Sequence, residues 1–178
     1  MLKYSFILLL LFLFTSCQNV LTDYTPDQQE VSQIIAEKAL EKVQSKIGSD
    51  YLWGADGPDE FDCSGLIVWS YKESLKEERI FYNGVTVVDD VSMADIYEHN
   101  VRLLSLDEVI PGDVIFITSE ENSISHGGLV VQIDNESGTV EFINASSYYG
   151  STVSDTWGLK QIVRGQWIVG FGRILISE

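Results

Sequence analysis

Apolar side chains recur every three or four positions between residues 31 and 47, the spacing of a helix that packs one face on a core. Thr25, Pro26 and Gln28 stand just before them in the order of a capping box, with proline at the first helical position. Gly48 follows as a typical helix-terminating residue. The pattern predicts a core-packing helix that begins after Thr25 and ends at Gly48.

A second helical stretch follows a polar, glycine-rich loop. The sequence SGLIVWSYKESLKEE, which begins at Ser64, is apolar almost all round at first and charged at its end. Such a stretch is typical of a buried helix that emerges into solvent. We predict that this helix begins near Cys63 and reaches solvent by Glu77. Residues 80–110 predict irregular structure with one short helix near Met93–Glu98.

Strand patterns replace helical ones after the turn signal Pro111-Gly112. Apolar runs separated by polar connections predict strands at 113–118, 127–133, 139–143 and 166–176. Residues 134–138 form the connection of a hairpin, and Gly170 would allow a bend in the last strand. Because helices precede strands, we predict one α+β domain over residues 26–178, with N-terminal helices packed on an antiparallel sheet.

The first 17 residues resemble an export signal. A short basic start is followed by a largely apolar run from Tyr4 to Phe14, well short of the about 20 residues that a membrane-spanning helix needs. Small residues then precede Cys17, as in the lipobox of bacterial lipoproteins. The resemblance implies a signal peptide at 1–16, a lipid on Cys17 and a tether at 17–25. We therefore expect export and anchoring at the periplasmic face of an outer membrane or at the cell surface. An ordinary cleaved signal peptide with an incidental cysteine is the alternative.

Composition limits the possible functions. The 178 residues carry 27 Asp and Glu against 11 Lys and Arg, and this net charge of −16 does not suit a nucleic-acid-binding surface. A hydrophobic content of 45% is enough for one packed core, and we expect a monomer. The histidines and cysteines lack the usual zinc spacing, and no dinucleotide-binding or phosphate-loop motif is present. We expect no metal and no cofactor.

The chain has two cysteines, and their roles are linked. If Cys17 carries lipid, Cys63 is a free thiol outside the cytoplasm. A Cys17–Cys63 disulfide and a buried structural thiol are the alternatives. The polar neighbours Asp62 and Ser64 favour a reactive thiol, which the unpaired N–H groups of a helix start would help to ionise.

A reactive thiol needs a base, and the chain offers two histidines. His99 lies in a polar stretch without a clear element, whereas His126 stands directly before a predicted strand that would fix its direction. The base needs an orienting partner in turn. If the 134–138 hairpin connection holds an odd number of residues, Asn144 lies opposite His126 or Gly128, within reach of the imidazole. A two-residue turn would place Asn144 on the other face, and turn formation is its alternative role.

Five motifs follow one another along the chain: Tyr51-Leu-Trp53-Gly54, Phe61-Asp-Cys-Ser-Gly-Leu66, Pro111-Gly-Asp-Val-Ile-Phe116, His126 before a strand, and Phe142-Ile-Asn-Ala-Ser146. Together they resemble the NlpC-type papain-like cysteine peptidases of bacterial cell walls. The likeness covers roughly residues 30–176, and its most specific part surrounds Cys63. It implies a papain-like fold in which the nucleophile begins a helix.

That resemblance implies a Cys-His-Asn triad, with Cys63 as nucleophile, His126 as base and Asn144 as the orienting residue, and it adds the Tyr51 hydroxyl near the sulfur. It implies cleavage of peptidoglycan stem peptides through a thioester, commonly after γ-D-glutamate. The residues expected to contact the substrate are Asp62, Ser64 and Trp53. Asp62 would hold a cationic amine of the peptide or, alternatively, cap the helix.

Two positions depart from the family pattern. Ala55 stands where a second glycine is common, and Gly127 follows the histidine where a β-branched residue is usual. Both concern the substrate groove more than the chemistry. Two other functions stay open: an amidase that cuts the sugar–peptide link on a related scaffold, and a catalytically inactive anchored binding protein. A lipid acyltransferase is disfavoured, because in permuted relatives the histidine precedes the cysteine.

Overall fold

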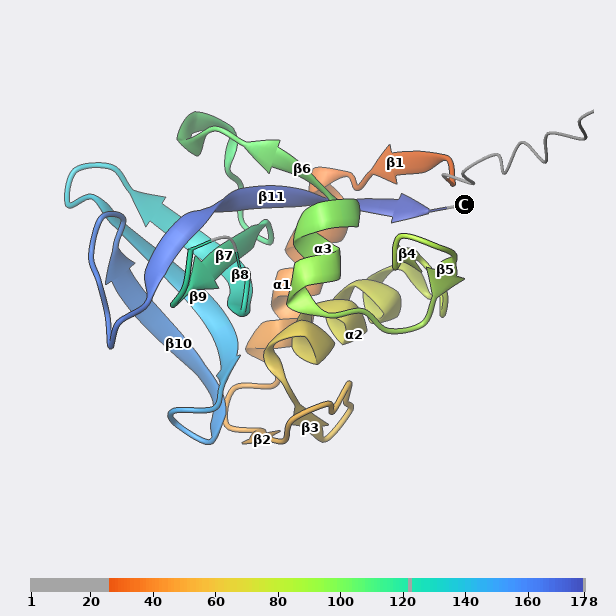
Figure 1. The fold of residues 1–178 in the computed structure, drawn as a ribbon, viewed down its shortest axis with the longest axis horizontal. Helices are drawn as coiled ribbons and strands as arrows, with labels where there is room; N and C mark the ends of the chain where they lie inside the picture. The colour runs from red at the N-terminus through yellow and green to blue at the C-terminus, as the bar shows by residue number, and fades with distance from the viewer. Residues whose placement is uncertain (1–25, 122, 178) are drawn as a thin grey trace, which may run out of the picture.

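The computed structural model describes residues 26–121 and 123–177 (Figure 1). The signal peptide, the lipid on Cys17 and the tether up to residue 25 are predictions that lie outside these residues. Within the described part of the chain, no helix has the length and apolar character needed to cross a membrane. The anchored form of the protein therefore stays a prediction.

The described residues form three helices, a short 3₁₀ turn and a series of strands. The helical elements are α1 (Gln33–Gln44), α2 (Cys63–Leu75), α3 (Met93–His99) and the 3₁₀ turn η1 (Leu106–Glu108). The short strands are β1 (Gln28–Glu30), β2 (Asp50–Tyr51), β3 (Glu60–Phe61), β4 (Phe81–Tyr82), β5 (Val87–Val88) and β6 (Val101–Leu104). The longer strands are β7 (Val114–Thr118), β8 (His126–Asp134), β9 (Thr139–Ser146), β10 (Ser151–Gly158) and β11 (Trp167–Ser177).

One large sheet runs in the order β1-β11-β7-β8-β9-β10-β2-β3, with β6 also paired to β11. Its pairings are antiparallel except that of β2 with β3. Helix α2 packs against β8 and β9, and α1 packs on α2, so the helices cover one face of the curved sheet (Figure 1). One apolar cluster fills this helix–sheet interface, and a second lies among β7–β11 on the other face. The predicted α+β fold is confirmed.

The start of the first helix was predicted wrongly. Residues Gln28–Glu30 form strand β1, which pairs with the end of β11 so that Gln28 faces Ser177. Helix α1 instead begins at Gln33 after Ser32. The capping-box pattern is a local signal, and pairing with a strand about 150 positions away overrides it, since an edge strand satisfies its backbone groups in the sheet. The helix ends at Gln44, and Gly48 completes the turn that follows.

The Pro-Gly-Asp turn joins the helices to the sheet. Gly112 has φ +93°, and a Cβ there would lie 2.1 Å from the carbonyl oxygen of Ala36 in α1, so only glycine fits. The Tyr71 hydroxyl of α2 donates to the carbonyl oxygen of Gly112 at 2.8 Å. The fully buried Asp113 carboxylate accepts two hydrogen bonds from Arg173 on β11, both 2.9 Å long. The turn thereby fixes α1, α2 and β11 relative to β7.

The region between α2 and β7 is more regular than the sequence indicates. The short helix expected near Met93 is confirmed as α3, and Ser92 and Asp95 form its capping box. Strands β4, β5 and β6, by contrast, occupy parts of residues 80–110 that we predicted to be irregular. The N-terminal end of α3 lies next to the start of α2, which gives this helix a place in the site described below.

Candidate active site

The start of α2 is held by one carboxylate. Asp62 caps the helix: its Oδ1 accepts from the backbone N–H of Gly65 at 2.8 Å and from the Ser64 hydroxyl at 3.0 Å. Its Oδ2 accepts from the backbone N–H of Gly54 at 2.9 Å. The cap therefore ties the glycine-rich loop to the first turn that carries Cys63. Helix capping, which we set against a substrate role for Asp62, is observed, while contact with substrate stays a prediction.

The glycine after the cysteine is required by close packing. A Cβ at Gly65 would lie 2.1 Å from the carbonyl oxygen of Ala55. The same carbonyl accepts from the backbone N–H of Asp62 at 2.8 Å. The loop and the helix start thus meet backbone to backbone, which explains the Cys-Ser-Gly order. Ala55, a departure from the family pattern, makes this contact through its carbonyl group, so its side chain does not interfere with it.

Cys63 has a free thiol and is buried, with 8% of its surface exposed. Its Sγ lies 4.0 Å from the carbonyl oxygen of Ser125. Burial, followed by the negative charge of Asp62, raises the pKa of the thiol to about 12. The backbone N–H groups of Ser64, Cys63 and Gly127 act in the opposite direction without cancelling the effect of burial. We expected the helix start to keep the sulfur ionised, but burial outweighs this effect and favours the protonated thiol.

His126 and Asn144 lie side by side on neighbouring strands. The His126 Nε2 is 3.0 Å from the Asn144 Oδ1, and Asn144 is almost fully buried. His126 is the first residue of β8 and sits between Ser125 and Gly127, whose backbone groups both approach the Cys63 sulfur. The structure therefore pairs two residues of the predicted triad, His126 and Asn144, and places the Cys63 sulfur beside the backbone on either side of His126. His99, the other histidine, lies at the far end of α3 against the Tyr82 ring.

The pairing of β8 with β9 places Asn144 near His126, as predicted, but a bulge in β8 produces this register. The hairpin connection has four residues, 135–138, and the strands beside it pair as Asp134 with Thr139. That even-numbered connection would put Asn144 on the wrong face. A bulge between Val130 and Gln132 shifts the register by one, so that Leu129 faces Ile143. One step further, Asn144 lies opposite Gly128. The predicted neighbourhood of His126 and Asn144 is confirmed, although the connection is even-numbered and the bulge supplies the shift.

Burial also acts on the imidazole. Burial lowers the pKa of His126, whereas the hydrogen bond that the ring donates to the Asn144 Oδ1 and the negative charge of Asp155 raise it. Gly127, where the family usually has a β-branched residue, is close to α3: a Cβ there would lie 2.4 Å from the Met93 Cε and 2.6 Å from the Ile115 carbonyl oxygen. Packing of α3 against β8 explains this departure.

A cavity of about 300 Å³ opens at the sulfur. Cys63, Asp62 and Ser64 line it together with Trp53, whose surface is 83% exposed, and with residues 90–94 and 124–125. Tyr51 lies beside the same centre, since the charges of Cys63 and Asp62 act with burial to raise the pKa of its hydroxyl. The residues predicted to contact substrate therefore surround the thiol.

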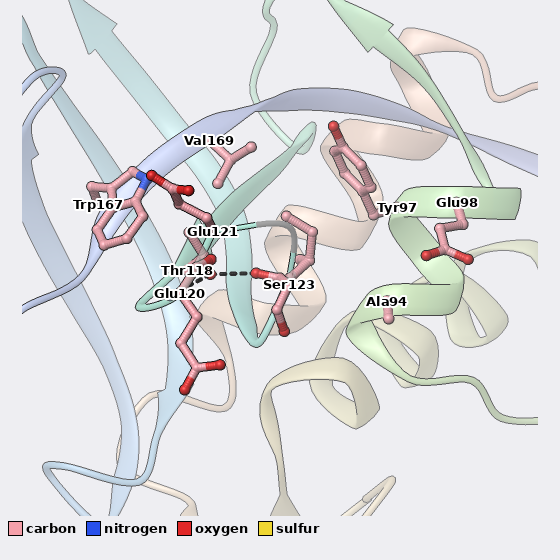
Figure 2. Close-up of a pocket in the computed structure, with 10 residues that line it drawn as sticks. Ala94, Tyr97, Glu98, Thr118, Glu120, Glu121, Ser123, Trp167 and Val169 are labelled. Carbon is pink, nitrogen blue, oxygen red and sulfur yellow. Dashed lines mark hydrogen bonds between the residues drawn. The ribbon is translucent and has the colours of Figure 1, made fainter.

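A second cavity, of about 580 Å³, adjoins the first through the shared lining residues Ala94 and Ile124. Figure 2 shows it between α3 and the start of β11, where the Thr118 hydroxyl bonds to the carbonyl oxygen of Ser123. Its remaining lining residues are Tyr97, Glu98, Glu120, Glu121, Trp167 and Val169. This cavity was not predictable from the sequence, because its walls come from three segments that are distant along the chain. Among the described residues, no group of three or more His, Cys, Asp and Glu side chains could hold a metal ion.

The stretch that carries this geometry also relates the protein to known ones. Residues 48–162, which include Cys63, His126 and Asn144, match the NlpC/P60 family. The chain belongs to the NlpC/P60 family. The resemblance read from the five motifs is thereby confirmed.

Among curated NlpC/P60 relatives, the chain is 28% identical over 138 residues to the probable endopeptidase p60 of Listeria seeligeri. It is 31% identical over 98 residues to the probable endopeptidase YafL of Escherichia coli. These matches cover 76% and 48% of this chain. The chain spans only 21% of the Listeria protein and 39% of the Escherichia coli protein.

Two solved structures have the same fold. NlpC2 from Trichomonas vaginalis matches with a TM-score of 0.57 at 25% identity, over 84% of this chain and 49% of that one. An N-acetylmuramoyl-L-alanine amidase from Bacteroides uniformis matches with a TM-score of 0.53 at 16% identity, over 81% of this chain and 99% of that one. At 16% identity the second likeness shows the fold alone.

Proposed function

We propose that this protein is a peptidoglycan hydrolase of the cysteine-peptidase type, which cleaves an amide bond in stem peptides after γ-D-glutamate. Membership of the NlpC/P60 family and the endopeptidase names of its relatives support a cell-wall hydrolase. The observation that carries the cysteine mechanism is local. The Cys63 thiol opens into a cavity beside the backbone on both sides of His126, and His126 bonds to Asn144.

The first half of the reaction forms a thioester. His126 takes the proton from the Cys63 thiol as the sulfur attacks the carbonyl carbon of the substrate amide. The negative charge that develops on the carbonyl oxygen is stabilised by the backbone N–H of Cys63 and by the Tyr51 hydroxyl. Protonated His126 then gives its proton to the amide nitrogen, the carbon–nitrogen bond breaks, and the amine product leaves.

The second half releases the acid. A water molecule enters the cavity left by the amine, and neutral His126 accepts one of its protons while the oxygen attacks the thioester carbonyl. Collapse of the intermediate breaks the carbon–sulfur bond, and the proton on His126 returns to the sulfur. Because burial favours a neutral thiol and a neutral imidazole, the enzyme begins and ends the cycle in this uncharged state.

The two adjoining cavities could hold a peptide whose scissile bond lies at the Cys63 thiol, with one cavity for each side of that bond. In this proposal Asp62, Ser64 and Trp53 contact the substrate on one side of the scissile bond. The larger cavity takes the other side, where carboxylates and aromatic rings favour a residue that carries a free amine. The proposal also includes a lipid on Cys17 that holds the protein at a wall-facing membrane surface, and its support is the lipobox-like sequence before Cys17.

The test is digestion of purified peptidoglycan by the full chain, purified in detergent. The wild type should release soluble fragments, and Cys63→Ala should lower the rate by at least about 10³-fold, because the nucleophile is absent. Mass spectrometry of the fragments identifies the bond from its new amino terminus. A Cys17→Ser variant serves as the control for the second cysteine. Undiminished release of fragments by Cys63→Ala would rule out the cysteine mechanism.

The same fragments decide between the two enzyme classes. An endopeptidase leaves γ-D-glutamate as a new carboxyl terminus, whereas an amidase leaves the complete stem peptide with its first amine free. A chain that binds peptidoglycan in a sedimentation assay but releases no fragment would instead be an inactive binding protein.

A further inference from the structure

The triad is extended by a fourth side chain from the next strand. Asp155 lies on β10, and its Oδ2 accepts a hydrogen bond from the Asn144 Nδ2 at 3.2 Å. Asn144 in turn is 3.0 Å from the His126 Nε2 through its Oδ1. Three neighbouring strands, β8, β9 and β10, thus supply a chain of contacts from imidazole to amide to carboxylate.

The placement follows from strand register. On β9 and β10, Asn144 pairs with Val153 and Phe142 pairs with Asp155. Residues two apart share a face, so Asp155 is the diagonal neighbour of Asn144 on the side that faces His126. Asn144 is 1% exposed, so water does not replace the carboxylate as its partner without a change in packing.

The donor and acceptor groups of Asp155, Asn144 and His126 fix the direction of each hydrogen bond between them. A carboxylate only accepts hydrogen bonds, and the nitrogen of an asparagine amide only donates. Asp155 therefore holds the amide nitrogen on its own side and turns the amide oxygen of Asn144 toward the ring. That oxygen only accepts, so the Nε2 of His126 must carry a hydrogen. In the neutral ring, Nδ1 is then the nitrogen that can accept a proton from a thiol.

We propose that Asp155 is a positioning residue of this site, which fixes the orientation of the Asn144 amide and through it the tautomer of His126. The inference concerns the ground state of the imidazole, and its effect on turnover rests on the proposed cysteine mechanism. Without Asp155 the amide can rotate by half a turn and present its nitrogen to Nε2. The ring proton then moves to Nδ1, and His126 can no longer accept the thiol proton.

The charge of Asp155 supports the same role. Among the described side chains, Asp155 on β10 is the charged group that acts on the His126 ring. Asp155 favours the imidazolium that forms when the thiol proton is transferred, while burial opposes it. Removal of this carboxylate should therefore lower the pKa of His126 further.

The primary test is Asp155→Asn in the full chain, because this variant keeps the side-chain shape and removes both the obligate acceptor and the charge. Nitrogen-15 NMR of the histidine ring should show a hydrogen on Nε2 in the wild type and a mixture of tautomers in the variant. The value of kcat should fall about tenfold, with KM changed by less than about twofold. Asp155→Glu should restore part of the loss. The control is Glu141→Gln on β9, which should change neither readout, because Glu141 bonds to Gln132 and Ser154 at the surface.

A double variant separates positioning from mere support of the fold. In an Asn144→Ala background, Asp155→Asn should have no further effect on kcat, because Asp155 acts through Asn144. An unchanged tautomer in Asp155→Asn, or losses that multiply in the double variant, would overturn the inference. If the wild type shows no turnover at all, the proposed function fails, and the NMR measurement alone then decides the role of Asp155.

Discussion

The domain has two buried polar centres. One holds a charged pair, and in the other burial favours the neutral forms of the titratable groups. In the structural centre, Asp113 and Arg173 form an ion pair whose hydrogen bonds are satisfied, and the Asp113 side chain is fully buried. In the reactive centre, burial pushes both Cys63 and His126 toward their neutral forms. A buried charge that is fully paired locks elements together, whereas a buried group that is kept neutral retains a proton that it can transfer.

The largest expected effect is on the structural centre. Asp113→Ala should lower the free energy of unfolding by about 3 kcal/mol, because it leaves the Arg173 guanidinium, 13% exposed, without its main partner. Urea denaturation measures this loss. A double change, Asp113→Leu with Arg173→Met, should lose less than the single variant, since it leaves no buried charge. An equal or larger loss in the double variant would show that the pair itself is strongly stabilising.

The next prediction concerns the protonated thiol. The rate constant for alkylation of Cys63 by iodoacetamide should rise about tenfold per pH unit between roughly pH 6 and pH 9, because the thiolate fraction does so below a pKa of about 12. Mass spectrometry of the peptide that contains Cys63 gives the rate, and the urea-unfolded chain provides the reference. A rate that levels off near neutral pH would indicate a preformed thiolate–imidazolium pair instead.

The pH profile of activity tests the imidazole. Since burial lowers the pKa of His126, the acid limb of kcat/KM should have its midpoint below pH 6.5. Stability follows the same sign: the unfolded chain binds a proton near pH 6.5 while the folded chain does not, so the free energy of unfolding falls as the pH drops through that value. His126→Gln should abolish this contribution. A midpoint above pH 6.5 contradicts the effect of burial.

The smallest effect is expected at the exposed edge of the structural centre. Glu30 contacts Arg102 and Arg173, with 36% of its side chain exposed. Glu30→Gln should cost about 0.5 kcal/mol or less, because solvent screens such pairs. The hydrogen bond from Arg102 lowers the pKa of Glu30, so this contribution is present above about pH 4.5 and is lost as the pH falls below it. Urea denaturation at two salt concentrations checks it, and a loss as large as that of Asp113→Ala would remove the distinction between buried and exposed pairs.

Local signals predicted the parts of the fold that depend on local chemistry. Asp62 and Gly65 mark the start of α2, and the apolar runs after Pro111 became β7, β8 and β9. The start of the first helix was wrong because Gln28 pairs with Ser177, a contact that no local pattern contains. Strand β10 was missed because its residues, STVSDTWG, are mostly polar and read as a connection.

The residues of the candidate site were predictable from the sequence, but the pKa values of its groups were not. Spacing and motifs singled out Cys63 and His126, which begin α2 and β8, and Asn144, which follows the apolar part of β9. The protonation of the thiol depends on how deeply neighbouring segments bury it, which a linear pattern does not reveal. Asp155 could be found only through the register of β9 and β10, since nothing in its immediate sequence distinguishes it from a surface residue.

The extra residue in β8, at Val131, shifts the pairing of β8 with β9 by one residue and so decides on which face of the sheet Asn144 lies. With it, a four-residue turn delivers an asparagine to the imidazole, and without it the same motifs would point that amide away from the ring. Family members that differ by one residue in this strand therefore need a compensating change in the turn. A search for functional relatives should accordingly count residues between the histidine and the asparagine, because intact motifs at the wrong separation would form a folded but unassembled site.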